Sequence, residues 1–125
     1  MSYDKLYIVN EDGSGLIELF NYPQGCYFPS WSPNGELLAF SSFALSGGIY
    51  YSKIFTYSFS TTHIQQITTK NTFDYHPTWS PDSKTILFSA NINGRGSIYS
   101  IDINGNNLTR ITDSLGTDYD ISWYN

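Results

Sequence analysis

The sequence has one cysteine, few charged residues and no excess of positive charge, and each of these shortages argues against a class of structure or partner. Cys26 has no second cysteine to pair with, so we expect a small, half-buried apolar side chain rather than a disulfide or a reactive thiol. Charged residues make up 14% of the 125 residues, and the formal net charge is -5. Because phosphate backbones and anionic membranes are bound by basic surfaces, we expect no nucleic acid and no membrane as a partner.

Long apolar runs and the motifs of common catalytic sites are also missing. No stretch approaches the ~18–20 apolar residues of a membrane span, and the opening "MSYDKLYIVN" lacks the charged start and apolar stretch of a signal peptide. As written, the chain is therefore expected in the cytoplasm. It has no Gly-x-Ser-x-Gly, no His-Glu-x-x-His, no paired cysteines and no phosphate-binding glycine loop. We therefore predict that the protein is not an enzyme, with no catalytic residue and no cofactor.

Aromatic residues, in contrast, are abundant. They make up 18% of the chain, with eleven Tyr, eight Phe and three Trp. Tyr, Phe, Ile and Thr favour strands, and the plentiful Asn, Gly, Asp and Ser favour turns. No segment sustains the 3.6-residue periodicity of a helix. The composition therefore predicts an all-β fold.

The chain also repeats itself. Trp31, Trp79 and Trp123 lie 48 and then 44 residues apart, and the other landmarks keep the same step. Equivalent segments are "LYIVN" (6–10), "IFTYS" (54–58) and "IYSID" (98–102), and likewise "LIELF" (16–20), "IQQIT" (64–68) and "LTRIT" (108–112). Each unit thus holds four short strands, and units of roughly 40–45 residues with four strands are typical of β-propeller blades.

These spacings give the predicted boundaries. A single domain over 1–125 contains a half blade at 5–20, a blade at 28–68, a blade at 76–112 and the start of a further blade at 119–125. The interval from Phe40 to Ile54 is four residues longer than its counterpart from Phe88 to Ile98. We expect the extra residues to form a longer loop within 43–53. The repeated Trp side chains are expected to lie in the core, since each brings a large apolar area.

The second blade carries a family resemblance. "PTWSPDSKTILFSA" (77–90), followed by "IYSIDINGNNLTRIT" (98–112), resembles the WD-like Pro-Asp repeat of TolB-type β-propellers. The resemblance implies a six-bladed ring that acts as a docking platform for other proteins. It also implies kinship with periplasmic proteins.

The strand count predicts self-assembly. About two and three-quarter four-stranded blades per chain amount to eleven strands, and two chains approach the ~24 strands of a six-bladed ring. An open arc leaves apolar faces in water. We therefore expect a homo-oligomer, a dimer in which "DISWYN" (120–125) of one chain completes the half blade of the other.

The predicted ligand-binding residues lie on the connections into the inner strands, which gather at one mouth of a propeller channel. These connections are aromatic and acidic, and Arg95 reaches the same face from the hairpin between the second and third strands. The candidates are Tyr27, Phe28, Asp74, Tyr75, His76, Arg95, Asp118, Tyr119 and Asp120. Packing between blades is the competing interpretation of these aromatic residues.

The sequence thus favours a non-catalytic propeller that binds a protein or peptide partner. A carbohydrate-binding, lectin-like module and a regulatory propeller fragment of a peptidase-type assembly are the alternatives. The turns "NEDGSG" (10–15) and "DINGN" (102–106) resemble short calcium loops, but no Glu closes either of them. We therefore interpret both as hairpin turns and predict no metal site.

Overall fold

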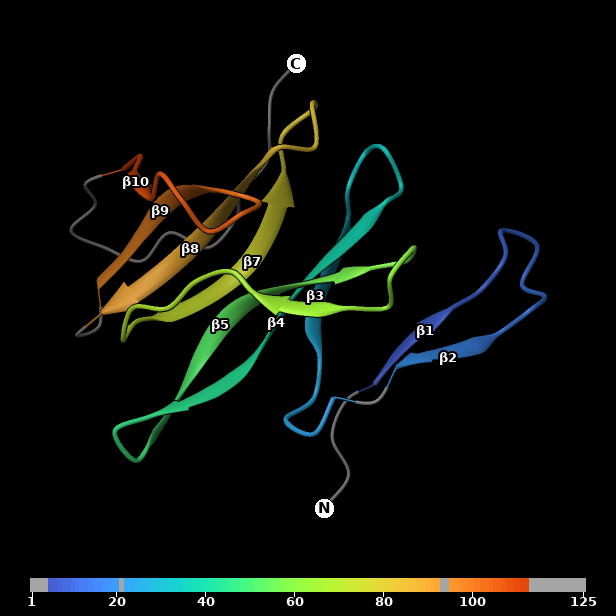
Figure 1. The fold of residues 1–125 in the computed structure, drawn as a ribbon, viewed down its shortest axis with the longest axis horizontal. Coiled ribbons are helices and arrows are strands. Elements are labelled where there is room, and N and C mark those ends of the chain that lie inside the picture. Colours follow the sequence, from blue (N-terminus) through green and yellow to red (C-terminus); the bar gives the residue numbers. More distant parts are fainter. Residues whose placement is uncertain (1–4, 21, 93–94, 113–125) are drawn as a thin grey trace.

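The structure is a computed structural model that describes residues 5–20, 22–92 and 95–112 (Figure 1). All regular elements in these ranges are strands, which confirms the predicted all-β class. The strands are β1 (Leu6–Ile8), β2 (Ile17–Phe20), β3 (Tyr27–Trp31), β4 (Leu37–Ser46), β5 (Ile49–Ser58), β6 (Ile64–Gln66), β7 (Phe73–Trp79), β8 (Thr85–Ile92), β9 (Arg95–Asp102) and β10 (Thr109–Arg110). Within the described part of the chain, no helix has the length and apolar composition needed to cross a membrane.

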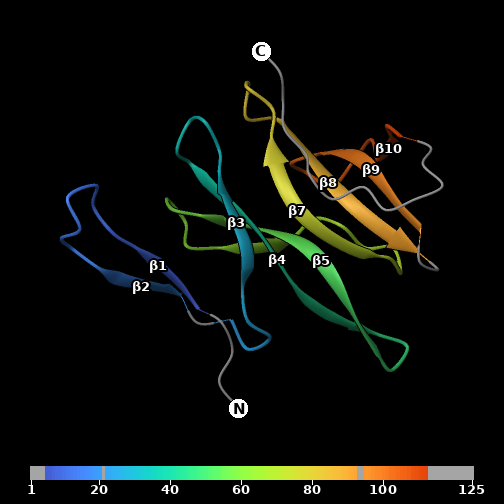
Figure 2. The same cartoon turned by 180° about the vertical axis from the view of Figure 1, so that it is seen from behind.

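The strands form two four-stranded antiparallel sheets and one two-stranded hairpin. The sheet orders are β3-β4-β5-β6 and β10-β9-β8-β7, and within the described ranges β1 pairs only with β2. We call the three units the first sheet (β3–β6), the second sheet (β7–β10) and the half blade (β1–β2). The first sheet lies between the other two units in both views (Figures 1 and 2). The described elements therefore stand side by side, as successive blades do.

The segment 43–53 is not a loop, and this prediction was wrong. β4 and β5 pair continuously from Leu37↔Ser58 to Ser46↔Ile49. Each has ten residues, whereas β8 and β9 have eight each, so the four extra residues lengthen both strands by two. Gly47 (φ 56°) and Gly48 (φ 82°) make the two-residue turn that such a hairpin requires. Two residues per strand also preserve the alternation of side chains between faces.

Repeated residues hold repeated turns. The Ser32 hydroxyl accepts a hydrogen bond from the Leu37 N–H at 3.0 Å, and the Ser80 hydroxyl accepts one from the Thr85 N–H at the same distance. These bonds close the turns between the first and second strands of each sheet. Likewise, the Thr68 and Thr112 hydroxyls accept the N–H groups of Ile54 and Ile98 at 3.0 and 2.9 Å. The Ser-Pro and Ile-Thr landmarks of the repeat therefore mark where side chains replace missing ladder bonds.

The core lies between the two sheets. Trp79 is 5% exposed, and its indole N–H donates to the Ser30 carbonyl across the seam at 2.8 Å. Around it gather apolar side chains of both sheets, which are Ala39, Ile54, Ile67, Ile86, Phe88, Ala90 and Ile101. A second cluster joins Leu6 of the half blade to the other face of the first sheet.

Trp31, which occupies the same repeat position as Trp79, is not in the core. Its side chain is 51% exposed and stacks on Phe59 with a centroid distance of 4.7 Å. The expectation of a buried Trp fails here for a physical reason. Trp79 packs against β3, the inner strand of the preceding sheet, whereas the unit that precedes Trp31 is a hairpin of two strands. The equivalent partner is missing among the described residues.

The two Trp residues give a matched test of this seam. Trp79→Ala removes a buried ring and an inter-sheet hydrogen bond, so we expect the free energy of unfolding to fall by about 3–5 kcal/mol. Trp31→Ala removes a half-exposed ring and should cost about 1 kcal/mol in dilute solution. Urea unfolding monitored by circular dichroism measures both losses. Equal losses would contradict the seam described here.

Candidate ligand-binding face

The segments that lead into the inner strands lie on one side of the sheets. Residues 22–26 precede β3 and residues 67–72 precede β7, and the turn at 47–48 lies on the same side (Figure 1). The turns at 32–36 and 80–84 lie at the opposite ends of β3 and β7. The long β4–β5 hairpin therefore extends the side on which the candidate residues were expected. Loops positioned by a rigid scaffold in this way are the usual carriers of binding.

Phe28 and His76 lie within the inner strands β3 and β7. Both have a left-handed backbone, with φ of 53° and 57°, and each directly precedes a proline in its inner strand. The strand register shifts at both places, so each residue sits in a bulge. The two rings are in tilted contact, with centroids 4.0 Å apart and planes inclined by 33°. The bulges therefore turn equivalent side chains of neighbouring blades toward one another.

Tyr75 completes this aromatic cluster. Its ring meets that of Phe28 edge-on, with centroids 6.3 Å apart. Phe28 is 45% exposed, and Tyr75 and His76 are half-buried, so the cluster presents aromatic surface to solvent. A left-handed non-glycine residue costs of the order of 1–3 kcal/mol and is often associated with binding sites. Three of the predicted candidates are thus brought together, and two of them, Phe28 and His76, have a strained backbone.

Tyr27 and Asp74 lie elsewhere. The Tyr27 ring packs edge-on against Phe43 of β4, with centroids 5.8 Å apart. Asp74 is 1% exposed and its carboxylate is already bound within the protein. Its assignment to an open ligand surface therefore needs correction, because the group lies in the seam between the sheets. Successive side chains of an inner strand point alternately to the channel and to the blade interior. The sequence did not show which positions face the channel, because the bulges at Phe28 and His76 interrupt this alternation.

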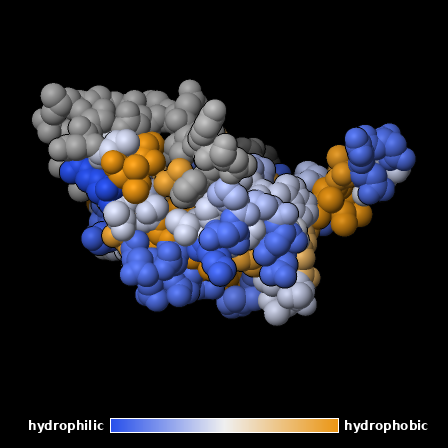
Figure 3. All heavy atoms as spheres, turned by 90° about the horizontal axis from the view of Figure 1, so that it is seen from above, coloured by the Kyte–Doolittle hydropathy of each residue, from blue (hydrophilic) through white to orange (hydrophobic). Residues whose placement is uncertain are grey.

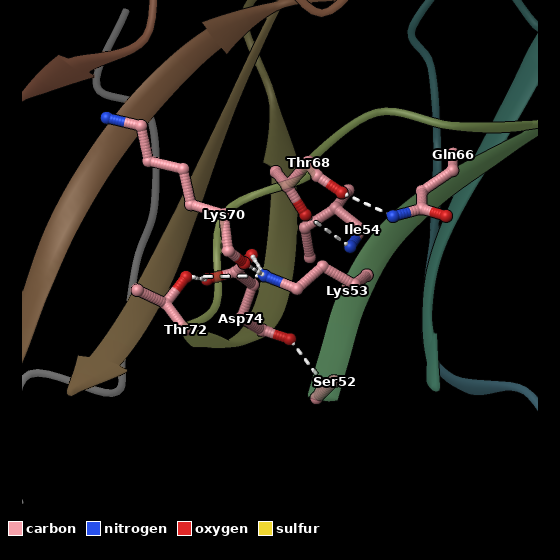
Figure 4. A network of polar contacts seen from close by, with 8 residues as sticks. All are labelled: Ser52, Lys53, Ile54, Gln66, Thr68, Lys70, Thr72 and Asp74. Carbon is pink, nitrogen blue, oxygen red and sulfur yellow. Dashed lines mark hydrogen bonds and ion pairs between the residues drawn. The ribbon is translucent and has the colours of Figure 1, made fainter. Parts of the chain in front are cut away.

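Asp74 is held by a network that joins the two sheets (Figure 4). The Lys53 ammonium of β5 donates to the Asp74 carboxylate at 2.8 Å, and the Thr72 hydroxyl donates to its second oxygen at 2.6 Å. Lys53 also donates to the carbonyl of Lys70, and the Ser52 hydroxyl donates to the Asp74 carbonyl at 2.5 Å. These bonds fix the start of β7, two residues before His76.

Burial dominates the electrostatics of this pair. The side chains of Lys53 and Asp74 are 3% and 1% exposed. Desolvation raises the pKa of the Asp74 carboxyl and lowers the pKa of the Lys53 ammonium, and the opposite charge of the partner acts against both shifts. Sequence reasoning missed Lys53. The available signal was that Lys53 is the only Lys, Arg, Asp or Glu within 37–69, in a strand of otherwise uncharged residues.

The remaining candidates stay predictions. Arg95 begins β9 opposite Ile92, and its side chain is not described. Asp118, Tyr119 and Asp120 lie outside the described residues. By repeat spacing, Asp120 is the third equivalent of Phe28 and His76. The side-chain oxygens of the two turns that resembled calcium loops accept hydrogen bonds within their own turns. The Asp12 carboxylate accepts the N–H and the hydroxyl of Ser14 at 2.9 and 2.6 Å, and the Asn104 side-chain oxygen accepts the Asn106 N–H at 3.1 Å.

Cys26 is a core residue. It is 4% exposed and packs in the cluster that joins the half blade to the first sheet. Burial raises the pKa of its thiol to about 12, although a backbone hydrogen bond at Tyr22 acts in the opposite direction. Since the thiolate is the reactive form, this raised pKa keeps the Cys26 thiol protonated and weakly reactive near neutral pH.

The thiol gives a pH-dependent prediction. In the unfolded chain Cys26 ionises near its ordinary pKa of ~8.5, well below its pKa in the folded protein. Its contribution to stability is therefore complete below that value and is lost as the pH rises toward 12. We expect the difference in unfolding free energy between the native chain and Cys26→Ala to shrink between pH 8 and pH 11. A difference that stays constant over this range would contradict a buried neutral thiol.

Comparison with known proteins decides the family. Residues 1–125 match the family model described as the TolB beta propeller domain. The chain belongs to this family. Among curated proteins none matches the sequence significantly.

Solved structures show the same TolB-type architecture. The crystal structure of TolB from Acinetobacter baumannii is 28% identical, with a TM-score of 0.73 over 91% of this chain. The putative TolB from Agrobacterium tumefaciens is 22% identical, with a TM-score of 0.72 over 92% of the chain. An oligogalacturonate lyase in complex with manganese shares the fold at 17% identity, with a TM-score of 0.67 over 99% of the chain. This chain spans only 28%, 40% and 32% of these three proteins, respectively.

Proposed function

We propose that this TolB-type propeller segment is a non-catalytic binding module for a peptide segment of another protein. The observation that supports this proposal most directly is the contact between the Phe28 and His76 rings, which two strained bulges bring together from neighbouring blades. An imidazole beside half-exposed aromatic rings offers both hydrogen bonding and apolar contact, a combination enriched at protein interfaces.

The described part of this face is aromatic and carries little free charge. The Asp74 carboxylate is neutralised by Lys53 within the seam. The partner is therefore expected to contribute apolar or aromatic side chains at Phe28, rather than a cluster of basic residues. Support for a binding role over a catalytic one comes from the Cys26 thiol, which is 4% exposed, and from the Asp74 carboxylate, which is already engaged by Lys53 and Thr72.

A carbohydrate is the second candidate ligand. Exposed aromatic rings also bind the apolar faces of sugars, and one protein that shares this fold is named as an oligogalacturonate lyase. A carbohydrate ligand of this chain would use the same aromatic cluster of Phe28, Tyr75 and His76. A glycan array separates this alternative from a peptide ligand.

The two histidines of the chain provide a matched experiment. A phage-displayed library of random 12-residue peptides is selected against the full chain, and the enriched peptides are measured by isothermal titration calorimetry. We expect Phe28→Ala and His76→Ala each to weaken binding at least tenfold. His63→Ala changes an exposed histidine in the β5–β6 turn and should leave the affinity unchanged.

Two results would overturn the proposal. One is an enriched peptide whose affinity is insensitive to both Phe28→Ala and His76→Ala. The other is the absence of any enriched peptide together with glycan-array binding that His76→Ala abolishes, which would establish the carbohydrate alternative.

A further inference from the structure

The seam between the first and second sheets contains a cavity that no side chain of the described residues fills. We propose that this cavity binds a small aromatic carboxylic acid, with the ring inside the cavity and the carboxylate at the Lys70 ammonium on its rim. The site is distinct from the Phe28–His76 cluster and does not depend on the proposed function. Each of the two sheets that enclose it has all four strands of a blade.

The cavity has an apolar floor and the size of one ring. Its volume is about 190 Å³, and it lies between the second sheet and the segment 67–72. The floor is formed by buried side chains, which are Ile67, Phe88, Ala90 and Ile101. Protein interiors contain few voids larger than a water molecule, and an apolar cavity of about 150 Å³ is large enough to bind benzene. The space therefore accommodates a single six-membered aromatic ring.

The preceding blade shows an aromatic ring in the equivalent place. In the first sheet the rings of Phe40 and Phe55 stack with centroids 5.7 Å apart, and the Tyr22 ring packs against both, with centroid distances of 6.2 and 5.3 Å. The repeat equivalents of Phe40 and Phe55 are Phe88 and Tyr99, whose rings stack in the same way at 5.9 Å. Both of these rings line the cavity. The second sheet therefore offers the same ring pair with open space beside it.

Position 70 explains why this space is open. Lys70 is the repeat equivalent of Tyr22, because each lies nine residues before the Trp of its blade. A flexible, charged side chain thus stands where the preceding blade has a phenol ring. The Lys70 side chain is on the exposed rim of the cavity and extends away from the buried Lys53–Asp74 pair (Figure 4). We assign the missing ring to a ligand.

The charges around the cavity favour an anionic ligand. The Asp74 carboxylate also lines the cavity, but it already accepts hydrogen bonds from the Lys53 ammonium at 2.8 Å and from the Thr72 hydroxyl at 2.6 Å. Within the described ranges, no carboxylate forms an ion pair with the Lys70 ammonium. Because the buried pair is neutral as a whole, Lys70 leaves one uncompensated positive charge at the rim. A carboxylate on a short chain from the ring can pair with this charge while it stays in contact with water.

Isothermal titration calorimetry of the full chain with hydrocinnamate, a phenyl ring on a short carboxylate chain, tests the inference. We expect saturable one-to-one binding. Hydrocinnamyl alcohol has the same ring without the charge, so it should bind at least tenfold more weakly. Lys70→Gln should weaken hydrocinnamate binding at least tenfold and leave the affinity for the alcohol unchanged.

Lys70→Tyr gives an independent measurement. This substitution supplies the ring that Tyr22 provides in the preceding blade, so it should fill the cavity, abolish the binding of both compounds and raise the melting temperature of the chain. Circular dichroism should show that every variant keeps its strand content.

Lys84→Gln is the matched control for the charge. Lys84 is exposed in the turn at 80–84, on the opposite side of the sheets, where Figure 3 shows polar side chains between smaller apolar areas. This variant and Phe28→Ala should both bind hydrocinnamate as the native chain does.

The inference fails if the native chain shows no saturable binding of hydrocinnamate, or if the alcohol binds as tightly as the carboxylate. Binding that survives both Lys70→Gln and Lys70→Tyr overturns it as well. So does binding that Phe28→Ala abolishes, because the ligand would then lie at the Phe28–His76 cluster.

Discussion

The buried ion pair between Lys53 and Asp74 is the interaction on which the described structure depends. It is a costly element, because taking two charges out of water costs several kcal/mol per ion and the attraction between them only partly offsets that cost. The pair is tolerated here because its hydrogen bonds are satisfied, with Thr72 and the Lys70 carbonyl completing the network. A pair of this kind contributes little net stability, but its hydrogen bonds form at only one relative position of the two sheets. We therefore regard it as the element that fixes how one blade stands against the next.

The arrangement of the aromatic face follows from that constraint. Asp74 is the second residue of β7, and the same carboxylate and carbonyl that anchor it to β5 set the path of the chain into the bulge at His76. The equivalent bulge at Phe28 lies in the neighbouring sheet, so the 4.0 Å ring pair exists only while the sheets keep their register. Trp79 closes the same seam nearer the other end of β7, where it binds the Ser30 carbonyl. The Lys53–Asp74 ion pair thus holds the seam at one end, and the hydrogen bond from Trp79 to Ser30 holds it toward the other end.

Much of the fold could be predicted from the sequence, because a repeated blade repeats its residues. The spacing of Trp31 and Trp79, together with the turn serines and the Ile-Thr landmarks, was enough to place the strands of both four-stranded sheets. The length difference within 43–53 was also visible, but its form was not. Whether four extra residues make a loop or lengthen a hairpin depends on the Gly47–Gly48 turn, and a two-glycine sequence allows either.

The candidate site was only partly accessible to the same reasoning. The repeat aligned Phe28 with His76. No sequence pattern indicated their left-handed backbone, because a residue before proline usually has an extended backbone. The exposure of Trp31 and the burial of Asp74 depend on what stands in the neighbouring blade. A repeated motif reflects the contacts within its own blade, whereas residues of the adjacent blade determine whether these two side chains are buried. That is why the sequence placed both residues correctly along the chain and assigned both to the wrong surroundings.

The most direct test of the central claim is a double-mutant cycle on the free energy of unfolding, using Lys53→Met, Asp74→Leu and the double variant. If the ion pair fixes the two sheets relative to each other, each single substitution leaves an uncompensated buried charge. Each should then lower the free energy of unfolding by about 3–5 kcal/mol. The double variant should cost far less than the sum, because both charges are then absent. Additive losses, or single losses below about 1 kcal/mol as for an exposed pair, would contradict the account.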